Sequence, residues 1–331
     1  MDTIKRRTFL LGGAALAASA QALRPVAALA QGASNFPNKP IRFIVPLAAG
    51  GGLDFIARLV AEAVTRDLGQ QVVVDNRTGA GGTIGIEAAI KSAPDGYSIL
   101  ISNDNVASAP HVQQLPADFT KDLVAVSLLG RQPHAFAVHP SLGVNSMVEL
   151  IKLGKEQPGQ GCATSGVGSN QHVLLETFMK AADVRFTHVP YRGAGQAIGD
   201  LVGGHVKIGC LGPAALMPHV KAGALKIVAQ SGAKRSPSLP DVPTLAELGY
   251  KDVVVESWYG AFVPTGTPPA VIASLNTAFD KAMADEGVRS KLHRSATEPV
   301  GGPADTLAKQ YAEAHQRYGR AVKELNITTK K

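Results

Sequence analysis

Short apolar runs alternate with amphipathic segments along the chain from residue 41 onward. Residues 41–46 predict a buried strand, and the segment after them places apolar side chains on one face at helical spacing before Gly69. That face consists of Ile56, Leu59, Val60, Ala63 and Val64. Strands that alternate with helices in this way indicate a parallel sheet covered on both faces.

The alternation falls into two blocks. The first block adds strands at 71–76 and 97–102, a glycine turn and helix at 78–93 and a polar loop at 103–110. The second block predicts strands at 161–165, 185–190, 206–212 and 225–230, with glycine turns and helices between them. A chain of this length and pattern predicts two compact α/β lobes.

Long apolar stretches outside this alternation carry the chain between the blocks. Residues 123–130 and 134–140 follow each other without a helix, and 253–264 lead into helices that start at Pro269. We therefore predict an α/β fold of two lobes with a cleft between them. Lobe 1 comprises residues 36–132 plus 255–331, and lobe 2 comprises residues 133–254. Ligands of open α/β sheets bind beyond the carboxyl ends of the strands, so both lobes contribute such ends to one cleft.

Residues 1–30 have the layout of an export signal, with a basic start, a short apolar stretch and a small-residue cleavage site ending at Ala30. Arg6, Arg7 and Phe9 occupy the places of a twin-arginine signal, with ordinary secretion as the alternative. The apolar stretch is too short to span a bilayer well. The expected location is the periplasm, without membrane insertion of the mature chain.

Net charge bears on the class of binding partner, and the two cysteines bear on whether the chain holds a disulfide. Without residues 1–30 the chain keeps 29 basic and 25 acidic residues, a net charge of +4 that is spread along its length. Because no basic stripe with interleaved aromatic residues occurs, nucleic acid is not an expected partner. Cys162 and Cys210 form either a disulfide or two small buried apolar side chains.

Two glycine-rich loops carry the candidate chemistry, one in each predicted lobe. The loops are "AAGGG" at residues 48–52 and "TSGVGS" at residues 164–169, where polar side chains join the glycines and a helix follows. Glycine lets a backbone approach a ligand closely, and the first N–H groups of a helix lack internal partners and attract anions. Neither loop has the spacing of a nucleotide-binding motif. A small carboxylate fits such a cradle; the alternative is that tight turns need glycine in any case.

Two side chains near these loops allow more than one interpretation. Asp54 either accepts a hydrogen bond from a ligand amine or a bridging water, or is a favourable charge in a helix's first turn, worth about 0.3–1 kcal/mol. Ser165 and His172 can be a nucleophile and base, which makes a secreted serine hydrolase the alternative function. The simpler interpretation of His172 is a bond to backbone at a helix start. We predict a binding protein without catalysis, cofactor or metal.

A series of motifs runs through the chain in order: "FPNKPIRFIVPLAAGGGLDFIAR", "VVVDNRTGAGGTIG", "APDGYSILIS", "FTKDLVAVSLL", "CATSGVGSNQH", "THVPYRGAGQAIGDLVGGHV", "PHVKAGALK" and "AKRSPSLPDVPTLAELG". In this order and spacing they resemble the tripartite tricarboxylate transporter substrate-binding proteins, the Bug or TctC-like family. The resemblance covers residue 36 to the C-terminus. It implies a monomeric, type II-like two-lobe periplasmic binding protein that closes on a small organic acid.

The resemblance also implies ligand contacts and partners. In this family a ligand carboxylate is held by the first-lobe loop, partly through ordered water, and the second-lobe loop completes the grip. Carried over, the contacts are Leu47, Ala48, Ala49, Gly50, Gly51 and Asp54, and then Thr164, Ser165, Gly168 and Ser169. The closed form is expected to serve uptake or sensing through a tripartite membrane permease or a sensor protein.

The chain departs from the family pattern in the loops that contact the ligand. Leu47 and Ala49 stand where the family commonly has phenylalanine and proline. Asn103, Asp104 and Asn105 replace a loop that is usually rich in glycine and threonine. We expect these three residues to contact the ligand and to suit an amine or amide end. The alternative is that Asp104 and Asn105 cap the next turn.

Overall fold

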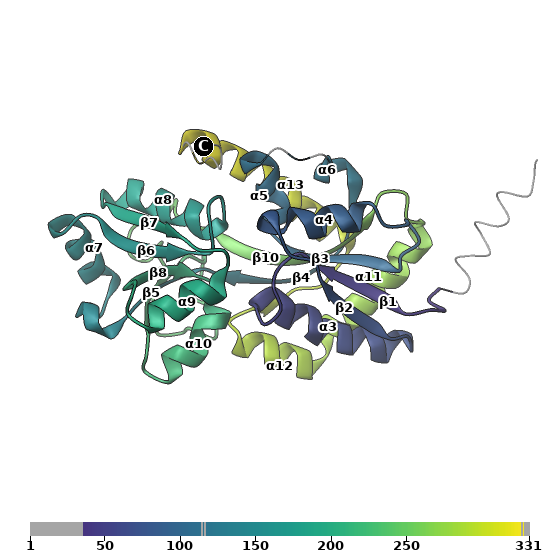
Figure 1. Cartoon of the computed structure of the whole chain (residues 1–331). Coiled ribbons are helices and arrows are strands. Elements are labelled where there is room, and N and C mark those ends of the chain that lie inside the picture. Colours follow the sequence, from purple (N-terminus) through teal and green to yellow (C-terminus); the bar gives the residue numbers. More distant parts are fainter. Residues whose placement is uncertain (1–35, 114, 116, 326, 328–331) are drawn as a thin grey trace, which may run out of the picture.

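The computed structural model describes residues 36–113, 115, 117–325 and 327. Two sheets form two lobes that lie side by side (Figure 1). Within the described residues, six strands form the sheet of the larger lobe and five form the sheet of the smaller lobe. The predicted export signal at residues 1–30 lies outside the described residues, so it stays a prediction.

The larger lobe contains a mixed sheet. β1 (Ile41–Val45) pairs in parallel with β2 (Val72–Asn76) and β3 (Ser98–Asn103). β10 (Glu256–Pro264) runs antiparallel between β3 and β4 (Leu123–Pro133), and β11 (Glu298–Pro299) forms the edge. The helices of this lobe are α3 (Gly52–Leu68), α4 (Thr83–Ile90), α5 (Asn105–Val112), α6 (Phe119–Asp122), α11 (Pro269–Ala284), α12 (Glu286–Arg294) and α13 (Ala304–Glu324), with the 3-10 turn η1 (Ala80–Gly82).

The smaller lobe repeats this plan. β6 (Gln160–Thr164) pairs in parallel with β7 (Phe186–Pro190) and β8 (Ile208–Leu211). β5 (Ala135–Val138) is antiparallel to β8 and to β9 (Lys226–Gln230). Its helices are α7 (Met147–Glu156), α8 (Asn170–Ala182), α9 (Ala194–Val202) and α10 (Pro213–Lys221), with the 3-10 turn η2 (Pro140–Leu142).

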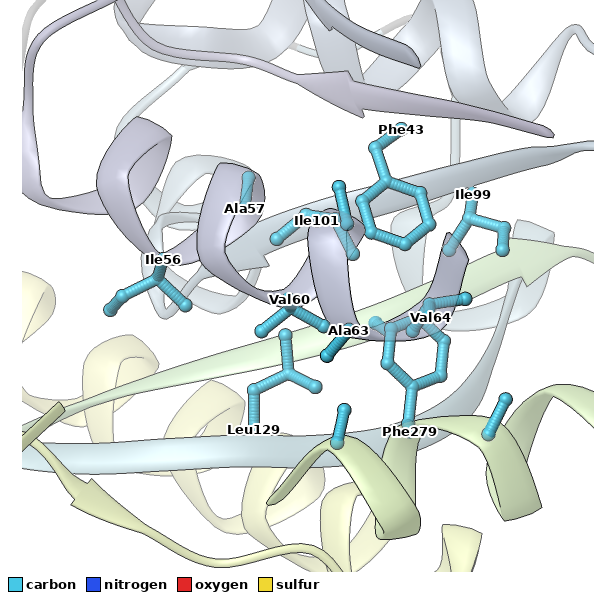
Figure 2. Close-up of a cluster of buried hydrophobic side chains, with 14 of the residues drawn as sticks. Phe43, Ile56, Ala57, Val60, Ala63, Val64, Ile99, Ile101, Leu129 and Phe279 are labelled. Atoms are coloured by element: carbon cyan, nitrogen blue, oxygen red, sulfur yellow. The ribbon is translucent and has the colours of Figure 1, made fainter. Parts of the chain in front are cut away.

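Each sheet is covered by helices on both faces, as the sequence predicts. In the larger lobe α3, α11 and α12 cover one face, and α4, α5 and α13 cover the other (Figure 1). Figure 2 shows the first of these layers, where Ile56, Val60 and Val64 of α3 point toward the sheet. The Phe43 ring on β1 stacks on Phe279 of α11 at 5.7 Å. Burial of each such side chain stabilises the fold by about 1.5–3 kcal/mol.

The chain passes between the lobes twice, close together. β4 ends at Pro133 and β5 begins at Ala135, so His134 is the crossing residue; β10 brings the chain back. The two crossings are bonded to each other through Ser231, whose hydroxyl accepts from the His134 N–H at 2.9 Å and donates to the carbonyl of Val255. Opening of the lobes must therefore act on this shared junction.

One expectation about local structure was wrong, and one helix was missed. Residues 103–110 were expected to be a polar loop, but most of them lie in α5, because Val106, Ala107 and Ala109 are buried against the sheet and α13. α7 was not predicted, although Ser146 caps its N-terminus by accepting from the N–H of Glu149. Among the described residues no helix combines the length and apolar character needed to cross a membrane.

Candidate functional site

The first-lobe loop, residues 46–51, joins the end of β1 to the start of α3. Ala48, Ala49 and Gly50 are exposed, while Leu47 and Gly51 are partly buried. Gly50 has φ +80°, a conformation that glycine adopts without cost, whereas Gly51 is extended at φ −82°. The first N–H groups of α3 follow directly, so this loop presents backbone donors at a helix N-terminus.

Asp54 is buried under this loop. Its Oδ2 atom accepts hydrogen bonds from the Gly50 N–H at 2.9 Å and from Arg58 Nε at 3.0 Å. Burial alone would raise the pKa of the Asp54 carboxyl, but the hydrogen bonds from Arg58 and Gly50 outweigh burial and hold this pKa below its ordinary value. The carboxylate is thus ionised at neutral pH and bonded to the loop itself.

The second-lobe loop, residues 164–169, joins β6 to α8 and is bonded internally. The Thr164 hydroxyl is buried, accepts from the N–H of Gly166 at 3.2 Å and lies 2.7 Å from His188 Nε2. Ser169 is the N-cap of α8 and accepts from the N–H of His172 at 3.3 Å. Gly168 has φ +74°. This loop too ends at a helix N-terminus.

His172 supports the same loop from behind. Its Nδ1 atom accepts from the Gly168 N–H at 3.1 Å, so the proton of the neutral ring lies on Nε2, which is 3.5 Å from a Glu176 oxygen. The His172 ring stacks on His188 at 3.7 Å. The Ser165 hydroxyl donates instead to Gln171 at 2.7 Å. In this geometry His172 bonds backbone at a helix start, and the Ser165 hydroxyl is engaged elsewhere.

The loop after β3 differs from the expectation for Asp104. Asn103 and Asn105 are partly buried, but Asp104 is fully buried. Its two oxygens accept from Ser257 Oγ and from the Tyr318 hydroxyl, each at 2.9 Å. Burial raises the pKa of Asp104 to about 7, although both hydrogen bonds act to lower it.

The consequences differ for the two interpretations of this loop. The Asp104 side chain does not cap α5, so capping by this residue is wrong. A ligand contact by Asp104 stays a prediction, and in this conformation both carboxylate oxygens already have protein donors. Ligand contact by Asn103 and Asn105 also stays a prediction.

The lobes approach each other at both loops. A Cβ added to Gly52 would lie 3.7 Å from the Tyr259 hydroxyl and 4.0 Å from Cβ of Ala214, which is in the first turn of α10. A Cβ added to Gly168 would lie 2.7 Å from Val112 of α5. The first turns of α3 and α10 thus meet across the lobes, and both helix N-termini lie at the junction of the lobes.

Sequence reasoning missed Tyr259 and Ala214 as neighbours of the first-lobe loop. Tyr259 lies within an apolar crossing stretch and Ala214 follows Pro213, so neither carries a chemical signal in the sequence. The one available clue was the position of Pro213 at the start of a helix after a strand. Of the two expectations for the cysteines, the structure shows the second, since Cys162 and Cys210 are both buried free thiols.

Two α/β lobes joined by two adjacent crossings, with the N-termini of α3 and α10 meeting between them, are the architecture of a two-lobe solute-binding protein. The profile described as "Tripartite tricarboxylate transporter family receptor" matches residues 56–327. The chain belongs to this family of periplasmic solute-binding receptors, also represented by the Bug proteins.

Relatives and solved structures agree with this assignment. Protein BugT of Bordetella pertussis is 35% identical over 302 residues, which cover 90% of this chain and 93% of BugT. A Rhodopseudomonas palustris protein solved with adipate is 29% identical, with a TM-score of 0.84 and coverage of 88% of this chain and 99% of that protein. MatC from Rhodopseudomonas palustris, solved with bound malate, is 28% identical, with a TM-score of 0.78 and coverage of 87% and 100%.

Proposed function

We propose that this chain is a periplasmic receptor that captures a small organic carboxylate between its lobes and catalyses no reaction. The observation that carries the proposal is the meeting of the α3 and α10 N-termini across the lobes, next to the exposed residues Ala48, Ala49 and Gly50 of the first-lobe loop. The adipate and malate complexes of related proteins support the same ligand class. The ligand stabilises the closed arrangement of the lobes by binding it more tightly than the open one.

The ligand contacts that we propose are those that the family resemblance implies, and they lie on the two glycine-rich loops. In the first lobe they are the backbone N–H groups of residues 47–49 and 51, since the Gly50 N–H already donates to Asp54, and in the second lobe the loop of Thr164, Ser165, Gly168 and Ser169. Asn103 and Asn105 stand nearby as candidates for the far end of the ligand. After export and cleavage near Ala30, the closed monomer is recognised by a tripartite membrane permease or a sensor protein.

Gly51→Val tests the first-lobe contact. Because Gly51 is extended and a Cβ there meets only the Ala48 carbonyl at 3.4 Å, the backbone accepts a side chain without strain. The branched side chain instead occupies the space in front of the donors. Loss of one charge-assisted hydrogen bond corresponds to about 1.5–3 kcal/mol, or one to two decades of affinity.

Calorimetric titration of the parent and Gly51→Val with adipate and with malate measures this loss, and melting curves check folding. Unchanged affinity in Gly51→Val would place the carboxylate elsewhere. The hydrolase alternative is tested on the same samples with p-nitrophenyl acetate. Ester turnover by the parent that disappears in Ser165→Ala would replace the receptor proposal by an enzyme.

A further inference from the structure

Three side chains link the two ends of the first-lobe loop by hydrogen bonds. Asp54 Oδ2 accepts from the Gly50 N–H at 2.9 Å and from Arg58 Nε at 3.0 Å. Arg58 Nη2 donates to Asn76 Oδ1 at 3.1 Å, and Asn76 Nδ2 donates to the Leu47 carbonyl at 3.0 Å. The path therefore starts at one end of the loop and finishes at the other.

The three side chains reach the loop from fixed elements. Asp54 and Arg58 lie one turn apart on α3, and Asn76 ends β2, where it pairs with Val45 at the end of β1. The guanidinium donates in two directions at fixed angles, which suits it to join a carboxylate to an amide. Between the two tied ends, Ala48 and Ala49 are exposed and have only methyl groups, so packing contributes little to the loop's shape.

The charges of this chain of bonds suit a site for an anion. An ionised Asp54 alone would repel a ligand carboxylate. Arg58 compensates its charge, and the Arg58, Gly50 and Asn76 donors together overcome the effect of burial on the Asp54 pKa. An ordinary ion pair between residues i and i+4 on a helix would explain Asp54 and Arg58, but it would not explain the Asn76 bonds to Arg58 and Leu47.

We propose that Asn76 and Arg58, acting with Asp54, are positioning residues that hold the first-lobe loop in the shape in which its backbone N–H groups meet the ligand carboxylate. They do so without touching the ligand. This inference rests on the proposed carboxylate site and adds the part of the protein that shapes it.

Asn76→Ala, compared with Asn276→Ala, is the first test. Asn276 lies on α11 of the same lobe, away from the loop, and its side-chain amide also donates to backbone, to the carbonyls of Val126 at 2.8 Å and Gly302 at 2.9 Å. We expect Asn76→Ala to bind adipate or malate about 5- to 30-fold more weakly. Asn276→Ala should lower the melting temperature and leave affinity unchanged.

Arg58→Lys, compared with Arg66→Lys, is the second test. Both arginines lie on α3 and are half exposed, and Arg66 makes surface ion pairs with Glu62 and Asp285. A lysine at position 58 keeps the charge, but one ammonium group cannot bridge Asp54 and Asn76 as the guanidinium does. Affinity should fall in Arg58→Lys by a factor similar to that of Asn76→Ala and stay at the parental value in Arg66→Lys.

Hydrogen–deuterium exchange of residues 46–52 provides a measurement that needs no ligand. In Asn76→Ala and Arg58→Lys we expect faster exchange in this segment alone, with parental exchange elsewhere. If the parent binds neither probe, the proposed ligand class fails while the exchange data still test the loop. If the parent binds and both variants bind and exchange like the parent, the positioning role is wrong.

Discussion

At the scale of single residues, Gly168 combines a constrained backbone with a contact between lobes. Its φ of +74° disfavours any side chain, and a Cβ there would lie 2.7 and 2.9 Å from the two methyl groups of Val112 in the other lobe. Gly143 offers a comparison in the same lobe, since it has φ +72° and no atom of the described residues lies within 4 Å of an added Cβ. The two glycines thus share the backbone requirement and differ in the contact.

Gly168→Ala and Gly143→Ala should therefore behave differently. Each variant should lose about 1–2 kcal/mol of unfolding free energy, because alanine is strained at positive φ. Only Gly168→Ala should also weaken adipate or malate binding, because its methyl group collides with Val112 when the lobes meet. Chemical denaturation and calorimetry measure the two quantities. Equal affinities in the two variants would contradict a contact that forms on closure.

At the scale of elements, two stacked histidines connect α8 and β7 behind the second-lobe loop. His172 accepts from Gly168, and His188 Nε2 lies at hydrogen-bond distance from Thr164 Oγ1, so the pair supports both ends of the loop. Burial, aided by the charge of His172, lowers the pKa of His188 to about 4. Glu176 on α8 also acts on this pKa, and its charge raises it.

The depressed pKa of His188 predicts an acid-dependent loss of stability. Below its unfolded pKa of about 6.5 the unfolded chain binds this proton and the folded chain does not, so the free energy of unfolding falls from pH 6.5 toward pH 4. His188→Gln should lack this contribution. The difference in melting temperature between parent and variant should shift in favour of the variant between pH 7 and pH 4.5. A difference independent of pH would show that His188 titrates normally.

The elements near the site divide into those with a local signature and those without one. α3 was predictable because Ile56, Val60 and Val64 repeat at helical spacing and are buried. The burial of Asp104 was not, because its partners Ser257 and Tyr318 lie 153 and 214 residues away in the chain. The role of Arg58 could not be predicted either, because its hydrogen bond to Asn76 depends on the pairing of β1 with β2.

At the scale of the whole molecule, Asp104 connects three parts that ligand binding has to coordinate. It follows β3 at the predicted ligand loop, and its carboxyl group is bonded to Ser257 near the return crossing and to Tyr318 on α13. α13 packs on β4 and α5 and also touches α8 of the smaller lobe. The loop after β3 is thereby joined by hydrogen bonds to the return crossing and to α13.

The structure has its lobes in contact, which predicts the outcome of a solution measurement. Without ligand, small-angle X-ray scattering should give a larger radius of gyration than the one calculated from this structure, because open molecules are populated. Saturating adipate or malate should reduce the radius of gyration to the calculated value and raise the melting temperature. At a free ligand concentration 100 times the dissociation constant, binding adds about 2.7 kcal/mol to the free energy of unfolding. A ligand that stabilises the protein without compaction would contradict closure.

The strand order also has a consequence for folding during synthesis. The strand partners of β4 are β10 and β11, both of which are made after the whole smaller lobe. The smaller sheet uses strands from one continuous stretch, β5 to β9, and can be completed while the chain is still being synthesised. The larger lobe thus begins first in the sequence and is completed last. The edge of β3 stays unpaired until residues 256–264 are made and form β10 between β3 and β4.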